Sequence, residues 1–282
     1  AARTKPIIVI KSGITAEGAI SVAHHTGEHA GRDVVYDAAF KRSGMLRVKD
    51  LHQLYAAFET LANTKIIKGD RLAVITNGGA PGIMAVDALI SRGGKLAELE
   101  SNILDPLSQL MPEYWPRTNP VDIAGDATPQ RFAKAVSAVL DSKQVDTLLI
   151  IHSPSAVASG EEFASHIVAA IAAHPRRKRV NILTNWTGED SAYGGRRIIR
   201  KAGFPTYRTP EGAIGAFMHM VEYRRNQRLL QETPKSISRH YQTDPQKVRE
   251  LAQQLIADGH SHIDLNLASP LLTSYGLKTI ET

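Results

Sequence analysis

The stretch Arg71-Leu72-Ala73-Val74-Ile75-Thr76-Asn77-Gly78-Gly79-Ala80-Pro81-Gly82 decides how this chain folds. Its first six residues are mostly apolar, which is typical of a strand buried on both faces of a parallel sheet. The glycine-rich run predicts a turn that opens a helix over residues 83–91. Glycine lets a backbone approach an anion, and the start of a helix carries partial positive charge. The turn therefore predicts either a phosphate site or a tight turn that needs positive φ, and spacing alone does not separate the two.

The pattern repeats along the chain after this stretch. Further strands are expected at residues 96–99, 145–151, 180–184 and 205–208, and helices at 128–140, 161–173, 191–202 and 211–230. Five strands that alternate with helices predict an α/β fold with a doubly wound, flavodoxin-like parallel sheet. Ligands bind beyond the carboxyl ends of the strands in such sheets, which is where residues 77–82 fall. Ser153 and Ser155 follow the 145–151 strand, where a serine hydrolase would have the pattern G-x-S-x-G, which is absent. We expect them either to line the same strand-end cleft or to cap the next helix.

The N-terminal residues hold too few strands for a complete sheet. We expect a buried strand at 7–10, helices at 15–23, 33–42 and 51–62, and a short strand at 45–48. This predicts part of a second, similar domain over residues 1–66, before the main domain over 67–232 and a linker with the start of another region over 233–282. Both ends look cut from a longer polypeptide.

A histidine-rich segment, Ala23-His24-His25-Thr26-Gly27-Glu28-His29-Ala30-Gly31, is expected to form a glycine-flanked loop. Three interpretations stay open on the residues alone. His25 and His29 have the i, i+4 spacing of metal ligands, but no carboxylate pattern supports them, so no metal site is predicted. The segment is otherwise an ordinary polar loop, or His25 is a nucleophilic imidazole that accepts a phosphoryl group.

Composition narrows the classes of function. The chain has no cysteine, which excludes disulfides and thiolate sites and fits a cytoplasmic protein. No apolar run is long enough to span a bilayer, so no membrane is expected. The net charge of +6 is concentrated in basic clusters such as Arg176-Arg177-Lys178-Arg179, which are either solvated or attract an anionic partner. They lack interleaved aromatic residues, so nucleic acid is not expected as a partner.

Several motifs resemble the NDP-forming acyl-CoA synthetases, relatives of succinyl-CoA synthetase. The phosphohistidine segment of that family is similar to Lys11-Ser12-Gly13, Glu17-Gly18-Ala19, His25-Thr26-Gly27, Ala30-Gly31 and Tyr36-Asp37-Ala38-Ala39-Phe40. Its second flavodoxin-like domain is similar to Thr76–Gly82 followed by Asn119-Pro120-Val121-Asp122. Residues 209–227 more specifically resemble the bacterial branch fused to a GNAT domain, the Pat-type protein lysine acetyltransferases.

The resemblance implies a mechanism in which His25 is phosphorylated and passes the phosphoryl group between an acyl phosphate and ADP. It implies phosphate contacts from Thr26, Gly27, Gly78, Gly79, Ala80 and Gly82. Two helix N-termini, one near residues 27–33 and one at 79–82, would face the phosphohistidine. The fragment itself is expected to hold no cofactor. ATP or ADP with Mg²⁺, and CoA, are implied for the full-length protein, together with a CoA thioester, ATP-grasp and CoA-binding domains, and a homo-oligomer.

The segment also departs from the family pattern. His24 stands where the family usually has serine, and Glu28-His29 stand where it has small or apolar residues. Some Pat-type relatives have lost the histidine and with it the ligase chemistry, which leaves a sensor of CoA metabolites. Because His25 is retained, the ligase interpretation stays open beside that regulatory alternative. The acyl substrate and the nucleotide preference do not follow from the sequence.

Overall fold

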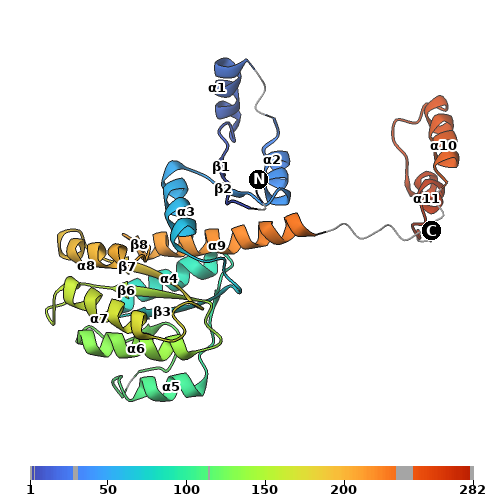
Figure 1. Ribbon diagram of the computed structural model, residues 1–282. Helices are drawn as coiled ribbons and strands as arrows, with labels where there is room; N and C mark the ends of the chain where they lie inside the picture. Colours follow the sequence, from blue (N-terminus) through green and yellow to red (C-terminus); the bar gives the residue numbers. More distant parts are fainter. Residues whose placement is uncertain (1, 3, 28–30, 114, 233–243, 280–282) are drawn as a thin grey trace. The chain divides into compact units, whose positions relative to one another are not determined.

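The computed structural model describes residues 1–282 except 1, 3, 28–30, 114, 233–243 and 280–282. The chain forms two compact units, Ala1–Gln231 and Glu232–Thr282. In the first unit an N-terminal part of two strands and three helices precedes a six-stranded sheet with its helices (Figure 1). The second unit has two helices, each capped by an aspartate side chain: α10 (Pro245–Ala257) by Asp244 and α11 (Leu265–Ser274) by Asp264.

The main sheet is parallel throughout its described strands. Its order is β4-β3-β6-β7-β8, and β5 pairs with β3 on the same side as β4. The strands are β3 (Arg71–Thr76), β4 (Lys95–Leu96), β5 (Val121–Asp122), β6 (Thr147–His152), β7 (Asn181–Trp186) and β8 (Thr206–Tyr207). The prediction of a doubly wound parallel sheet is therefore confirmed. The predicted strand over 96–99 is wrong in extent, because β4 contains only Lys95 and Leu96.

An asparagine side chain replaces part of the strand ladder between β4 and β5. Asn119 accepts a hydrogen bond from the Val74 amide at 2.9 Å. It also donates to the carbonyl oxygens of Leu72 and Ala97, both at 2.9 Å. The Asn119 side chain thus supplies hydrogen bonds to the part of β3 that neither β4 nor β5 pairs with. This explains how two short strands can share one edge of β3.

Helices cover both faces of the sheet, and alternate residues of each strand serve the two cores. On one face Ala73 and Ile75 pack with α5 (Ser101–Ser108), α6 (Pro129–Asp141), α7 (Gly160–Ala173) and α8 (Asp190–Lys201). On the other face Leu72 and Val74 pack with α4 (Gly79–Ser91) and α9 (Pro210–Gln231) (Figure 1). This two-sided burial is the physical reason for the apolar run over 72–75.

The N-terminal part is smaller and more open. Strands β1 (Ile8–Ile10) and β2 (Leu46–Val48) form a two-stranded parallel sheet, flanked by α2 (Asp33–Arg42) and α3 (Leu51–Asn63). Its small core joins Leu46, Val48 and Ala57 to Tyr223 of α9. The prediction that strand 7–10 is buried on both faces is wrong: β1 is only half-buried and Ile10 is exposed, since the described chain gives it a single neighbouring strand.

Candidate functional site

The glycine-rich turn after β3 presents the start of α4 at the carboxyl edge of the sheet. The helix begins at Gly79, earlier than the predicted residue 83, and Gly78 is its N-cap without a side-chain hydrogen bond. Thr76 holds this turn closed, because its hydroxyl accepts from the Gly78 amide at 3.0 Å and donates to the Gly78 carbonyl at 2.8 Å. The amides of Gly79 and Ala80 therefore point out of the first turn with no intrahelical acceptor.

Close packing, and not positive φ, explains the glycines. Gly78 has a φ of −137°, and among the described glycines those with positive φ lie elsewhere. A Cβ at Gly78 would overlap the Ser153 hydroxyl, one at Gly82 would lie 2.8 Å from Thr76 Cγ2, and one at Gly79 would lie 3.1 Å from Asp122 Oδ2. The interpretation of this stretch as a turn that needs positive φ is therefore wrong. The backbone comes close to its neighbours here, as an anion-binding turn requires.

A buried asparagine joins this turn to the end of the next strand. Asn77 donates from its amide to the Ser153 carbonyl at 2.9 Å and accepts from the Ser153 backbone N–H at 2.7 Å. The Ser153 hydroxyl is buried beside Gly78 and has no hydrogen-bond partner among the described residues. As expected, Ser153 lies at the same edge, and the two strand ends form one rigid rim around the α4 N-terminus.

His25 lies on the last turn of a helix and not in the predicted loop. Helix α1 runs Ala16–Thr26, past the predicted end at residue 23, and Gly27 ends it in the left-handed conformation with a φ of 73°. His24 and His25 are exposed. The last turn of a helix carries partial negative charge from its carbonyl groups, which disfavours an added phosphoryl group at this position. Glu28 and His29 lie outside the described residues.

The predicted site residues fall into two separate groups. Gly78, Gly79, Ala80 and Gly82 share the start of α4, whereas His25, Thr26 and Gly27 share the end of α1. No described pocket and no hydrogen bond between described residues joins the two groups. Over the same residues, no cluster of three His, Cys, Asp or Glu side chains could hold a metal ion.

Charged residues clamp the segment that carries His25 at both of its ends. Lys11 precedes α1 and lies 3.7 Å from the Asp33 carboxylate at the start of α2. Its ammonium also lies 4.9 Å from the centre of the Tyr36 ring. Arg47 of β2 binds Asp33 at 2.6 Å and Asp37 at 3.4 Å. The hydrogen bond from Arg47 lowers the pKa of Asp33, and the hydrogen bond from Lys41 lowers the pKa of Asp37.

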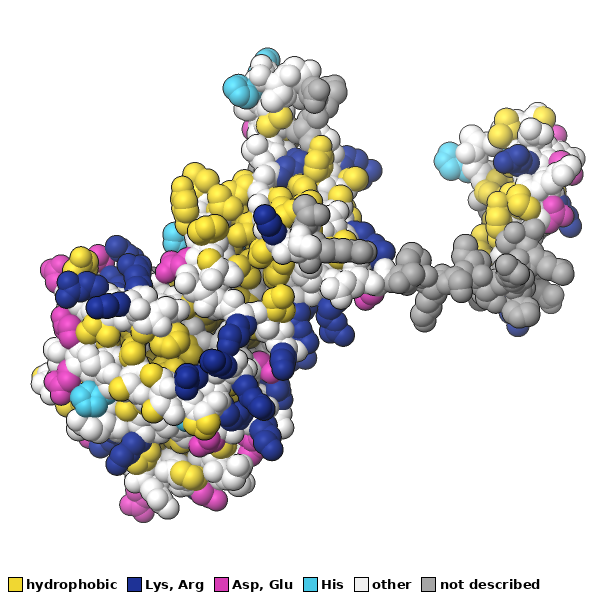
Figure 2. Space-filling model, in the orientation of Figure 1, with side chains coloured by type: hydrophobic (Ala, Val, Ile, Leu, Met, Phe, Trp, Pro, Cys, Tyr) yellow, Lys and Arg dark blue, Asp and Glu magenta, His cyan; other side chains and the backbone are white. Residues whose placement is uncertain are grey.

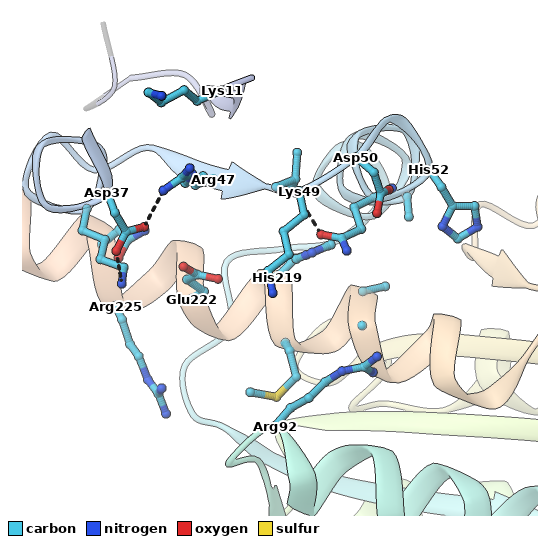
Figure 3. A pocket seen from close by; sticks show the side chains of 18 of the residues that line it. Lys11, Asp37, Arg47, Lys49, Asp50, His52, Arg92, His219, Glu222 and Arg225 are labelled. Atoms are coloured by element: carbon cyan, nitrogen blue, oxygen red, sulfur yellow. Dashed lines mark hydrogen bonds and ion pairs between the residues drawn. The ribbon is translucent and has the colours of Figure 1, made fainter. Parts of the chain in front are cut away.

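These clamp residues line a cleft of about 1060 Å³ between the N-terminal part and α9 (Figure 3). Its α9 wall carries His219 and, one turn later, Glu222. Burial, with a contribution from Arg92, lowers the pKa of His219 to about 4, and burial raises the pKa of Glu222. The sequence does not predict this cleft, because its walls come from segments that lie more than a hundred residues apart in the chain.

Both parts of the chain are similar to known protein domains. Residues 1–61 match the succinyl-CoA ligase like flavodoxin domain, and residues 72–188 match the ligase-CoA domain. Residues 1–61 and 72–188 are therefore succinyl-CoA ligase-like domains. The motifs around His25 fall in the first match, and both Thr76–Gly82 and Asn119–Asp122 fall in the second.

Relatives of these succinyl-CoA ligase-like domains are ADP-forming acyl-CoA ligases. An acetate–CoA ligase [ADP-forming] from Methanocaldococcus jannaschii is 30% identical over 98% of this chain and 39% of its own length. A 4-hydroxybutyrate–CoA ligase [ADP-forming] from Nitrosopumilus maritimus is 27% identical over 97% of this chain and 38% of its own length. The chain thus spans well under half the length of these relatives.

A solved structure supports the same relationship. The dinucleotide forming acetyl-coenzyme A synthetase 1 from Ca. Korarchaeum cryptofilum, in complex with phosphate and ADP, superposes with a TM-score of 0.76 at 30% identity. The match covers 82% of this chain and 49% of that one. None of the described helices of these succinyl-CoA ligase-like domains is both long and apolar enough to cross a bilayer.

Proposed function

We propose that this chain is the central region of an ADP-forming acyl-CoA ligase in which His25 carries the phosphoryl group. The observation that carries the proposal is the start of α4, where close-packed glycines leave the Gly79 and Ala80 amides open at the carboxyl edge of the sheet. This is a preformed anion site, rigidly held by Asn77 and Thr76.

The proposed reaction has three balanced steps. Phosphate attacks the thioester carbonyl of an acyl-CoA, and the thiolate leaves as CoA, which gives an acyl phosphate. An imidazole nitrogen of His25 then attacks phosphorus, and the carboxylate leaves. Finally a terminal phosphate oxygen of ADP attacks the phosphohistidine, and the imidazole leaves, which gives ATP. The open amides of α4 would stabilise the charge of the phosphoryl group while it is carried by His25.

The described residues do not supply every group that this reaction needs. In the proposal, the metal–nucleotide site belongs to an ATP-grasp domain, and the CoA site to a CoA-binding domain, of a longer protein. His25 also needs to leave its place at the end of α1, because the donors that suit a phosphoryl group lie at the α4 turn. Helix α1, which carries His25, is the part of the chain that would move.

Phosphorylation of the full-length protein tests the proposal. With ATP labelled at the γ-phosphate, we expect an acid-labile, base-stable label on the wild type and on His24→Ala, and no label on His25→Ala. His24 is a matched control because it lies beside His25 on the same exposed turn. Absence of label from the wild type, or equal label on both variants, would contradict the proposal.

Two observations favour a second candidate, a regulatory region of a Pat-type protein lysine acetyltransferase that senses CoA metabolites. His25 sits at the carbonyl end of α1, an unfavourable place for phosphate, and His24 departs from the family pattern. This alternative predicts that acetyl-CoA binds the full-length protein by calorimetry while no label appears on any histidine. Labelling that is lost only in His25→Ala contradicts it.

A further inference from the structure

The amino-terminal edge of the main sheet carries a dense group of cations, opposite the edge that holds the α4 turn. Three segments meet there: the connection before β3, the loop before β6 and the loop before β7. The exposed cations that they contribute, here called the basic edge, are Lys65, Lys68, Lys143, Arg177, Lys178 and Arg179. Lys and Arg side chains gather on this part of the molecule in Figure 2.

Hydrogen bonds hold the segments of the basic edge in fixed positions. The Asn181 side chain accepts from the Lys65 amide and donates to the Lys65 carbonyl, both at 2.9 Å. The Lys65 ammonium donates to the Lys178 carbonyl at 2.8 Å. Arg176 donates to the carbonyl oxygens of Asp141 and Ser142. The cations are therefore displayed by anchored backbone, so little ordering is needed before a partner binds.

Carboxylates balance only part of the positive charge of this surface. Asp146 binds Arg71 at 2.8 Å, and Asp70 lies 3.6 Å from Arg225. Asp141, at the end of α6, lies 3.2 Å from His174. Lys65 and Arg176 bond to neutral carbonyl groups, which do not cancel their charge. No ion pair among the described residues involves residues 177–179. Repulsion between like charges that are not balanced destabilises a fold.

An amphipathic groove of about 520 Å³ continues the basic edge onto α9. The charged residues that line it are all cations, namely Lys65, Arg224 and Arg228. Its apolar lining includes Leu61, Ile66, Ile67, Met220 and Tyr223. Ile66 is 71% exposed, although the Asn181 side chain holds the backbone of the preceding residue, Lys65, in place. Lys65 belongs to both surfaces, so groove and basic edge are continuous.

We propose that the groove and the basic edge together bind an acidic protein segment, with an apolar side chain of that segment seated on Ile66 and its carboxylates on Arg224, Arg228 and the 177–179 loop. Arginine pairs with carboxylates in a bidentate manner, and an aliphatic lining suits leucine or isoleucine. A nucleic acid fits less well, because bases stack on exposed aromatic rings and the one ring in the groove, Tyr223, is buried. This binding function is independent of the proposed ligase chemistry.

Fluorescence anisotropy with a labelled peptide tests the proposal on the full chain. The probe is a fluorescein-labelled peptide of glutamates interrupted by leucines, compared with an all-glutamate peptide and with labelled oligothymidylate at physiological ionic strength. We expect the leucine-containing peptide to bind tightest. The double variant Arg224→Glu/Arg228→Glu should weaken it by about tenfold or more.

Matched variants distinguish a specific binding site from general electrostatic attraction to a basic protein. Lys247→Glu/Arg249→Glu on α10 makes the same change in charge at residues that belong to neither the groove nor the basic edge, and should alter binding by less than about twofold. Ile66→Ala should weaken the leucine-containing peptide several-fold and leave the all-glutamate peptide unchanged, because only the former buries apolar surface. If Arg224→Glu/Arg228→Glu does not fold, Arg177→Glu/Lys178→Glu in the exposed loop replaces it.

Three results would overturn the proposal. One is an equal loss of binding in the α10 control. Another is oligothymidylate that binds as tightly as the peptide and displaces it, which would indicate a general polyanion surface. The third is an absence of peptide binding to the wild type.

Discussion

Replacement of one buried histidine should change how the stability of the main sheet depends on pH. His152 ends β6 and is 1% exposed. Its ring stacks on Trp186 with the centroids 4.9 Å apart and packs on Phe163 at 4.8 Å. Neither ring nitrogen has a hydrogen-bond partner among the described residues. Burial therefore favours the neutral imidazole and lowers the pKa of His152 from 6.5 to about 4.

The sign and size of the effect follow from the difference between the two states. In the unfolded chain the imidazole takes up a proton near its ordinary pKa, so the unfolded state binds more protons than the folded state between about pH 6.5 and pH 4. Stability should fall as pH is lowered through this window, by about 3 kcal/mol in total and by about 2 kcal/mol on reaching pH 5. His219 acts in the same direction, because burial lowers its pKa to about 4 as well.

Urea denaturation at about pH 7 and about pH 5 measures the effect through far-ultraviolet circular dichroism. His152→Phe keeps a stacked ring but cannot take up a proton, so we expect it to lose about 2 kcal/mol less than the wild type between these conditions. His166→Gln, at a half-buried position on α7, is the matched control and should keep the wild-type pH dependence. The reasoning fails if His152→Phe and wild type lose equal stability, or if NMR shows His152 titrating near its ordinary pKa.

Three further substitutions test the sheet edge, the α4 turn and the clamp. Asn119→Ala removes three hydrogen bonds that seat β4 and β5 on β3, and should lower the free energy of unfolding by about 2 kcal/mol or more in urea. Gly82→Ala should lower the thermal midpoint because its Cβ would lie 2.8 Å from Thr76 Cγ2, whereas Gly215→Ala, whose Cβ would meet nothing closer than 3.8 Å, should leave it unchanged or raise it. Asp33→Asn removes the carboxylate shared by Lys11 and Arg47, so amide hydrogen exchange should accelerate in α1 and the start of α2 but not in β6. Unchanged exchange in Asp33→Asn would contradict the role of the clamp. So would an equal acceleration in α1 and α2 in the control variant Asp190→Asn, because Asp190 is exposed and forms no ion pair among the described residues.

Local pattern was enough to predict the main sheet. Apolar strands that alternate with amphipathic helices require a sheet covered on both faces. The structure agrees, because Leu72 and Val74 pack on one face of the sheet and Ala73 and Ile75 pack on the other. The glycines after β3 were correctly placed at the start of a helix. The choice between anion approach and positive φ could not be made from spacing, because it depends on Ser153, Thr76 and Asp122, which reach the glycines through the fold.

The histidine segment shows where sequence reasoning stops. Glycine at position 27 was interpreted as a sign of a loop, but it ends a helix that continues through His25, as a left-handed C-cap commonly does. The structure does not bring His25 to the α4 turn, so the union of the two remains a proposal. The clamp of Lys11, Asp33 and Arg47 was not predicted either, since each residue is an ordinary surface charge until β1, α2 and β2 lie together.

Helix α9 also determines the order in which the first unit is completed during synthesis. Its 22 residues extend roughly 33 Å. Ala213 packs in the sheet core, and Tyr223, further along the helix, packs in the N-terminal core. Leu46 and Val48 leave the ribosome long before Tyr223, so the N-terminal core stays open while the sheet domain is made. Contacts of such long sequence separation form slowly. Slow codons or pauses after residue 66 would therefore prolong the exposure of Leu46 and Val48, whereas a fault in α9 would leave them without their contact to Tyr223.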